Sequence, residues 1–321
     1  MFRQFLPAIF ISQRYLTTTA HTISMPNPPI APRKPVSVEK FGDQRVDEYF
    51  WLRERTSPGV IDYLNAENAY TQAVLGPLKG LQETLYQDML SRIKETDENV
   101  PYRKGEYWYY SRTEAGKQYS ILCRKKGSLE ASEEIVLDLN ELAIGKPFLG
   151  LSAFAVSPNG KLLAYSLDVT GFRQYTLQFK DLETGKTLGN KFERVTSVAW
   201  ANDNRTVFYV TEDATTKRSD RLSRFRVGAT PGGSAEELFH EPDELYGINV
   251  DVTRSKGYIV LNSESSETNE QYLLDARQPD GKFVSYLKRR ENAMYYVDHA
   301  GNDFFIVIND TGRNFRLVTA P

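Results

Sequence analysis

A turn followed by a strand-forming run recurs along most of this chain, and this repeat constrains its fold more than any other feature. The first residues of the repeated turns are separated by 55, 44, 52 and 46 residues. The runs after the turns are rich in β-branched and aromatic residues, which favour strands. The turns are YRKG (102–105), SPNG (157–160), ANDN (201–204), TRSK (253–256) and HAGN (299–302).

A repeat of roughly 45 residues that holds about four short strands has the length of one β-propeller blade. One small twisted sheet cannot bury both of its faces, whereas sheets stacked around an axis bury them against each other. A β-sandwich with coincidental turn spacing is the alternative, and the repeated strand–turn–strand order favours the propeller. We expect no helix after residue 100. Equivalent buried places on inner strands are expected for Tyr109, Leu163, Phe208, Val260 and Phe305.

The last repeat has room for fewer strands than the others. Five units begin near residues 101, 151, 196, 247 and 294, and the sequence ends at Pro321. Closed propellers commonly contain about 4–8 complete blades. A chain that ends inside a blade exposes a sheet edge. The sequence therefore predicts a mainly β protein whose domain over residues 100–321 is an incomplete, truncated propeller.

Helical patterns are confined to residues 57–99. Ser57 and Pro58 are typical of a helix start, and apolar residues recur behind them at helical spacing. Gly76 and Pro77 are expected to end this first helix. A second helix should follow and stop near Thr96. Residues 25–56 are expected to form an extended, proline-rich segment, because NPPIAPRKP (27–35) cannot form a helix.

Residues 1–24 differ in composition from the rest. They contain Arg3, Arg14 and several hydroxyl residues, and the first acidic residue of the chain is Glu39. This composition is typical of an organellar transit peptide, so it predicts import into mitochondria or a similar organelle. The alternative is a disordered tail on a cytoplasmic protein, with Met25 as another start.

Composition also bears on partners. The formal net charge is −2 and no long basic run stands out, so nucleic acid is not a predicted partner. No stretch approaches the ~18 apolar residues of a membrane span, so no membrane association is predicted. Cys123 is the one cysteine, which excludes a disulfide within the chain.

Ser234 is the first candidate nucleophile, because Gly232-Gly233-Ser234 resembles half of the G-x-S-x-G turn of serine hydrolases. Glu236, however, stands where close packing requires glycine. A polar loop between blade strands explains Ser234 better. The three histidines are His21, His240 and His299, and none lies in a catalytic signature. His240 and His299 are expected in solvated blade turns.

Metal and phosphate motifs are not evident either. HEPDE (240–244) lacks the second histidine of a zinc motif. The pairs Asp243-Glu244 and Glu133-Glu134 are interpreted as solvated loop charges. The sequence therefore predicts no catalytic residue, no cofactor-binding residue and no metal ligand in this chain.

Several stretches resemble prolyl oligopeptidase family serine peptidases, and oligopeptidase B in particular. Together they cover roughly residues 28–321, and the order Arg53-Glu54 is a one-residue departure from the usual acidic position in the first stretch. The stretches are DEYFWLRE (47–54), VPYRKGEYWYYSRTEAGKQYSILCRKKG (100–127), FAVSPNGKLLAYSLDVTGFRQYTLQFKDLETG (154–185), VAWANDNRTVFYV (198–210) and NFRLV (314–318).

The resemblance implies a seven-bladed propeller, of which about five blades are present, and a C-terminal α/β-hydrolase domain that holds the Ser, Asp and His of the triad. It implies cleavage of short peptides after Lys or Arg by the complete enzyme, with this chain alone inactive. The helical segment 57–99 would pack on the hydrolase domain, so its apolar face is expected to be exposed here. That face comprises Ile61, Leu64, Leu81, Leu85 and Met89. The alternative is a non-enzymatic propeller scaffold that binds a protein or peptide partner.

Overall fold

The computed structural model describes residues 26–228 and 234–321. The chain divides into two compact units, Met1–Lys94 and Glu95–Pro321, which are described separately. The predicted transit segment lies outside the described residues, as do Gly232 and Gly233 of the candidate serine turn. In the part of the chain that is described, no helix is both long and apolar enough to cross a membrane.

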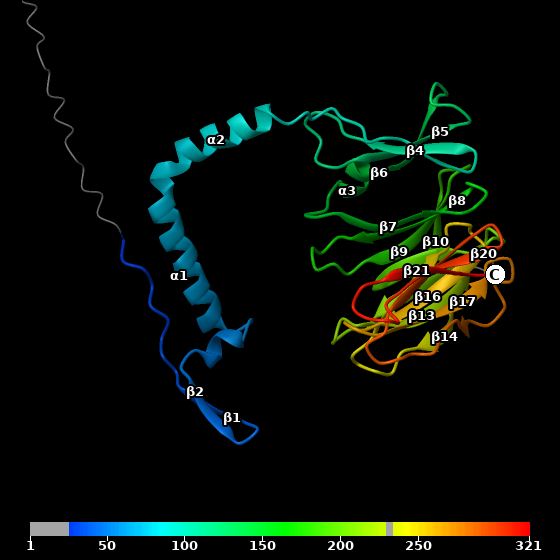
Figure 1. Ribbon diagram of the computed structural model, residues 1–321. Helices are drawn as coiled ribbons and strands as arrows, with labels where there is room; N and C mark the ends of the chain where they lie inside the picture. Colours follow the sequence, from blue (N-terminus) through cyan, green and yellow to red (C-terminus); the bar gives the residue numbers. More distant parts are fainter. Residues whose placement is uncertain (1–25, 229–233) are drawn as a thin grey trace, which may run out of the picture. The chain divides into compact units, whose positions relative to one another are not determined.

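The first unit contains a hairpin followed by helices (Figure 1). Its elements are β1 (Val36–Lys40), β2 (Asp43–Asp47), a 3-10 turn (Phe50–Arg53), α1 (Pro58–Leu75), a 3-10 turn (Gly76–Leu78) and α2 (Lys79–Ser91). The hairpin was not expected from the sequence. Phe41 and Gly42 both have positive φ between its strands, and only glycine tolerates that conformation without cost.

The two helices lie where the sequence pattern places them. Ser57 is extended and Pro58 is the first residue of α1, which needs no amide hydrogen at that position. Val60 is the one buried residue of α1, and α2 has none. The five apolar residues of the expected face are exposed by 44–59%.

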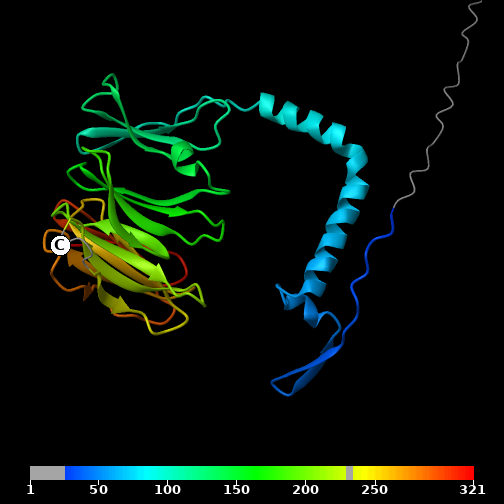
Figure 2. The same cartoon turned by 180° about the vertical axis from the view of Figure 1, so that it is seen from behind.

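The second unit consists of five antiparallel sheets that follow one another along the chain (Figures 1 and 2). Each is a meander in sequence order, with four strands in the first four sheets and three in the fifth. The first sheet is β3 (Tyr102–Lys104), β4 (Tyr107–Arg112), β5 (Ile121–Lys126) and β6 (Glu133–Asp138), and the second is β7 (Gly150–Val156), β8 (Leu162–Asp168), β9 (Thr176–Asp181) and β10 (Thr187–Phe192). The third is β11 (Val195–Trp200), β12 (Thr206–Glu212), β13 (Ser219–Arg226) and β14 (Glu236–His240). The fourth is β15 (Gly247–Val252), β16 (Tyr258–Glu264), β17 (Asn269–Asp275) and β18 (Val284–Ser285), and the fifth is β19 (Tyr295–Ala300), β20 (Asp303–Ile308) and β21 (Arg316–Ala320).

Consecutive sheets pack face to face, and each interface holds its own apolar cluster. Side chains alternate between the two faces of a strand. In β8, Leu163 and Tyr165 therefore pack on the first sheet, whereas Ala164 packs on the third. Four of the five repeated turns lie where the first strand of a sheet leads into the second. YRKG (102–105) is instead mostly strand β3, and the turn before β4 is formed by residues 105–106. The mainly β fold with an incomplete propeller is confirmed.

The expected equivalence of five buried strand residues is wrong in two places. Phe305 is 37% exposed, because Phe304 and Ile306 face the fourth sheet and Phe305 faces away from it. Leu163 is buried but faces the preceding sheet, whereas Phe208 faces the following one. For Leu163, a one-residue offset in aligning the repeats moves the side chain to the opposite face of the strand. Phe305 faces away from the preceding sheet, as Phe208 does, and it is exposed because no described sheet packs on that face.

A short helix, α3 (Leu139–Ala143), follows β6, so the expectation of no helix after residue 100 is also wrong. The Asp138 side chain accepts hydrogen bonds from the amides of Asn140 and Glu141. These bonds satisfy two of the amides that a helix leaves free at its first turn. Five residues are too few to show the apolar spacing by which a helix is recognised in a sequence.

Candidate functional site

Ser234 is an exposed residue two positions before the first residue of β14. Glu236, which replaces the glycine of a nucleophile turn, is a strand residue whose carboxylate lies 2.6 Å from Nη2 of Arg224. Within residues 26–228 and 234–321, no hydrogen bond joins Ser234 to a histidine. This arrangement provides no base for the Ser234 hydroxyl.

The two described histidines lie in strands, which corrects their expected placement in solvated turns. His240 is the exposed last residue of β14, with Nε2 3.5 Å from a carboxylate oxygen of the buried Asp220. His299 is half-buried in β19, where its ring contacts those of Tyr258 and Phe304.

His299 does contact a serine, because its Nδ1 lies 2.8 Å from Oγ of Ser255. That hydroxyl already accepts a hydrogen bond from the amide of Gly257 and lies 3.0 Å from Oγ1 of Thr253. Among the described residues, no carboxylate forms a hydrogen bond with the His299 ring. An activated serine needs a base that is itself oriented by an acid. The pair therefore stabilises the TRSK turn rather than forming a catalytic dyad.

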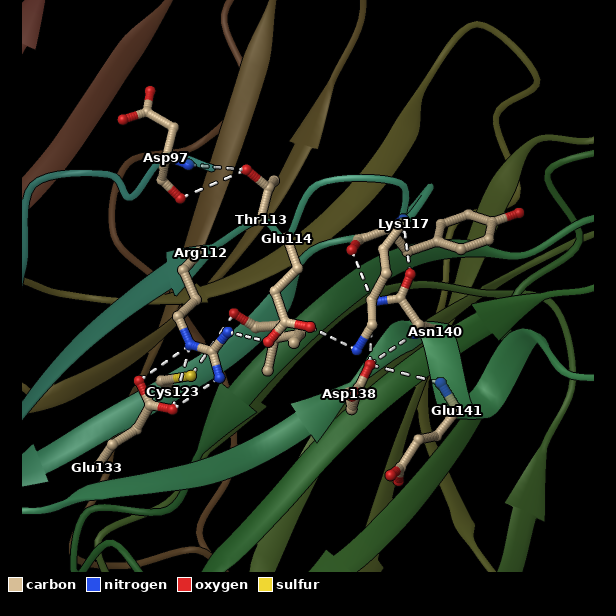
Figure 3. Close-up of polar contacts among 12 residues, drawn as sticks. Asp97, Arg112, Thr113, Glu114, Lys117, Cys123, Glu133, Asp138, Asn140 and Glu141 are labelled. Atoms are coloured by element: carbon tan, nitrogen blue, oxygen red, sulfur yellow. Dashed lines mark hydrogen bonds and ion pairs between the residues drawn. The ribbon is translucent and has the colours of Figure 1, made fainter. Parts of the chain in front are cut away.

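A network of charges lies on the face of the first sheet that points away from the second (Figure 3). Arg112 of β4 donates from Nε and Nη2 to the carboxylate of Glu133 in β6, at 2.9–3.1 Å. Its Nη1 lies 2.5 Å from Glu114, which also pairs with Lys117 at 2.6 Å. Tyr110 donates to the other side of Glu133 at 2.5 Å. Glu133 and Glu134 are exposed, as expected for solvated charges, but they lie in strand β6 and not in a loop. Each is also ion paired, Glu134 with Arg124 at 2.7 Å.

The same network determines the charge states around Cys123. Hydrogen bonds from Arg112 lower the pKa of Glu133, against a smaller opposing effect of burial. Burial and the neighbouring Glu133 raise the pKa of the Cys123 thiol to about 11. Only a thiolate is a good nucleophile, so Cys123 is unreactive at neutral pH. The charges of this network are paired with one another, and its described residues include no activated nucleophile.

We expect the Arg112–Glu133 pair to make stability depend on acid pH. The folded pKa of Glu133 lies below its unfolded value of about 4.3, so its contribution is complete above that pH and is lost as the pH falls through the folded value. Unfolding by urea should show Glu133→Gln to be less stable by about 1 kcal/mol at pH 7. The difference should vanish below the folded pKa, and a difference that stays constant down to pH 3.5 would contradict this explanation.

A second charge cluster stabilises the segment that connects the third sheet to the fourth, between β14 and β15. Glu241 is only 2% exposed, and it accepts hydrogen bonds from Ser263 at 2.5 Å and from Arg289 at 2.7 Å. The Arg289 guanidinium lies 3.7 Å from the centre of the Tyr246 ring. Arg218 donates to the carbonyls of residues 241, 243 and 246. Sequence reasoning missed this cluster because its members lie up to 71 residues apart, between Arg218 and Arg289.

The stacked four-stranded meanders define a β-propeller domain, and comparisons with known proteins identify its kind. The model of the prolyl oligopeptidase N-terminal β-propeller domain matches residues 28–321. The chain is 36% identical to dipeptidyl aminopeptidase BI of Pseudoxanthomonas mexicana, over 95% of this chain and 44% of that protein. It is 34% identical to protease 2 of Moraxella lacunata, over 91% of this chain and 43% of that protein.

Solved structures agree with this match. Oligopeptidase B from Leishmania major superimposes with a TM-score of 0.84 at 30% identity, covering 92% of this chain and 44% of that one. The chain belongs to the prolyl oligopeptidase family and contains its N-terminal β-propeller domain. It spans less than half the length of the relatives it matches.

Proposed function

We propose that this chain is the helical and propeller portion of an oligopeptidase-B-like serine endopeptidase. Joined to a C-terminal α/β-hydrolase domain, the complete enzyme cleaves short peptides after Lys or Arg. The observation that carries the proposal is the family match over residues 28–321 together with relatives named protease 2 and oligopeptidase B. The propeller restricts access to the active site, and the hydrolase domain supplies the triad.

The helical segment, residues 57–99, fits this assignment. Its apolar side chains, Leu81, Leu85 and Met89 among them, are each more than half exposed, and contiguous exposed apolar side chains are typical of an interaction surface. We infer that this surface packs on the hydrolase domain. The remaining proposed domains are a transit peptide or a disordered tail over 1–24, an extended proline-rich segment over 25–56, which also holds the β1–β2 hairpin, and the truncated propeller over 100–321.

A non-enzymatic scaffold is the second candidate, and one observation favours it. The face of the fifth sheet that points away from the fourth exposes Tyr296, Phe305, Val307 and Leu317. Apolar side chains that share one exposed sheet face are typical of an interaction surface. A scaffold would bind a protein or peptide through this face and would need no hydrolase domain.

We expect the purified chain to hydrolyse no arginyl peptide and to take up no fluorophosphonate probe. A serine reacts only when a base removes its proton and donors stabilise the oxyanion, and Ser234 has neither in the described structure. Intact-mass analysis after incubation with the probe, and a fluorogenic arginyl peptide, measure the two outcomes. Labelling of the chain that Ser234→Ala abolishes would contradict the assignment of Ser234 as an inert surface residue.

A further inference from the structure

The turn of the hairpin in the first unit has an unusual sequence. Phe41 and Gly42 form its two-residue loop, and both have positive φ, 56° and 78°. Asparagine or aspartate usually precedes the glycine of such a loop, because a bulky side chain is disfavoured at positive φ. Phe41 is moreover 96% exposed, so the chain itself does not bury the ring. Backbone strain at an exposed aromatic residue points to a role in binding.

One face of the same hairpin is both apolar and charged. We call it the hairpin face, and it consists of three cross-strand pairs, Val36 with Asp47, Val38 with Arg45 and Lys40 with Asp43. A groove of about 520 Å³ lies on this face, and Val38, Phe41 and Phe50 form its apolar part. All the residues of both strands are exposed, although an isolated two-stranded hairpin is only marginally stable in water. A surface that covers the hairpin face would therefore stabilise it.

The charges of the hairpin face are balanced, but only half of them are paired within the described residues. Arg45 forms an ion pair with Asp43, with Nε 2.6 Å from Oδ2. Lys40 beside the turn and Asp47 at the other end of the hairpin form no ion pair with any described side chain. Asp47 accepts one hydrogen bond, from the amide of Tyr49 at 2.8 Å. The two unpaired charges are opposite in sign and lie at opposite ends of one face, so this surface is complementary to a second copy of itself turned end to end.

We propose that the hairpin face binds the hairpin face of a second copy of this chain in a twofold-symmetric dimer. The twofold axis sets the two hairpins antiparallel, so that the turn of each lies at the base of the other. Lys40 of each copy pairs with Asp47 of the other. The Phe41 ring of each copy fills the groove of the other beside Phe50, as aromatic anchors in apolar pockets do at the centre of interfaces. The proposal does not depend on the peptidase assignment.

Sedimentation velocity of the complete chain over a concentration series tests the proposal. The chain should show a monomer–dimer equilibrium that Phe41→Asn weakens about tenfold or more, because burial of an exposed phenylalanine ring contributes at least that factor. Asparagine favours the positive φ of this turn, so the hairpin keeps its shape in the variant. Phe172→Asn is the matched control, because Phe172 is 78% exposed in the loop between β8 and β9. It should leave the equilibrium unchanged, and equal weakening by both variants would overturn the proposal.

Exchanging the unpaired charges tests the end-to-end pairing itself. Lys40→Asp and Asp47→Lys should each weaken dimerisation about tenfold or more, because each places like charges opposite one another twice in the dimer. An equimolar mixture of the two variants should dimerise like the unmodified chain, since both contacts of the mixed dimer again join opposite charges. A mixture that dimerises no better than its components would overturn the pairing. A chain that stays monomeric at every concentration, or a dimer that Phe41→Asn does not weaken, would overturn the proposal and favour a hydrolase domain as the surface that covers the hairpin face.

Discussion

Replacing Phe208 with alanine is expected to lower the free energy of unfolding of the propeller unit by about 3–5 kcal/mol. Phe208 is fully buried in the interface between the third and fourth sheets. Its ring meets that of Phe283 edge to face, with the centroids 5.5 Å apart. The substitution would leave a cavity between two sheets that contact each other through this cluster.

Phe305→Ala is the matched control, because it makes the same chemical change on the second strand of another sheet. Phe305 is partly exposed on the free face of the fifth sheet, so its loss should cost about 0.5 kcal/mol or less. Urea denaturation followed by the fluorescence of the buried Trp200 measures both variants. Equal losses for the two phenylalanines would contradict the stacked-sheet packing described here.

Replacing Arg289 with alanine is expected to cost about 3 kcal/mol at pH 7, the lower end of the range for breaking a buried ion pair. Glu241 would then keep its charge in a buried position with Ser263 as its remaining side-chain partner. Arg289 is itself partly exposed, which keeps the expected loss at the lower end.

The pH dependence of this loss is a separate expectation. Burial raises the pKa of Glu241, but hydrogen bonds from Ser263 and Arg289 outweigh it, so the folded pKa lies below the usual value. The stability from this carboxylate is therefore complete above the unfolded pKa and is lost as the pH falls through the folded pKa. The deficit of Arg289→Ala should shrink as Glu241 is protonated.

Arg277→Ala provides the control for charge removal. The Arg277–Asp275 pair has its guanidinium largely exposed, so its loss should cost about 0.2–1 kcal/mol. Chemical denaturation at pH 7 and pH 4 measures both variants. A deficit of Arg289→Ala that is no larger than that of Arg277→Ala would contradict the role assigned to the Glu241 cluster.

The repeated turns were the part of the fold that could be predicted from the sequence. A turn is a local structure fixed by a few residues such as Asn159 and Gly160, so its signal survives in the sequence. Strand order within each sheet follows, because neighbouring strands joined by short turns form meanders. The face to which Leu163 points could not be predicted, since it depends on strand register and not on composition.

The charge clusters could not be predicted for a different reason. Glu133 is paired with Arg112, which lies 21 residues away in the sequence. Glu241 is buried and is paired with Arg289, which lies 48 residues away. A single sequence shows no sign of such contacts, so the ion pair of Glu133 and the burial of Glu241 were not expected. The hairpin at residues 36–47 was hidden by the proline-rich stretch before it.

The role of Ser234, in contrast, could be predicted from the sequence, because the prediction depended on a mismatch between neighbouring residues. Glu236 could be recognised as incompatible with a nucleophile turn because that turn requires a residue without a side chain. The structure places Ser234 in an exposed position before β14. Whether the chain is inert remains a prediction for the probe experiment.

Sequencing the messenger RNA beyond the codon for Pro321 tests the central proposal most directly. A peptidase of this family needs a nucleophile, an acid and a base, and the α/β-hydrolase order of these residues is Ser, Asp, His. We predict an open reading frame that continues into a G-x-S-x-G serine, followed by an aspartate and then a histidine. A stop codon directly after Pro321 would contradict the peptidase assignment and favour the scaffold.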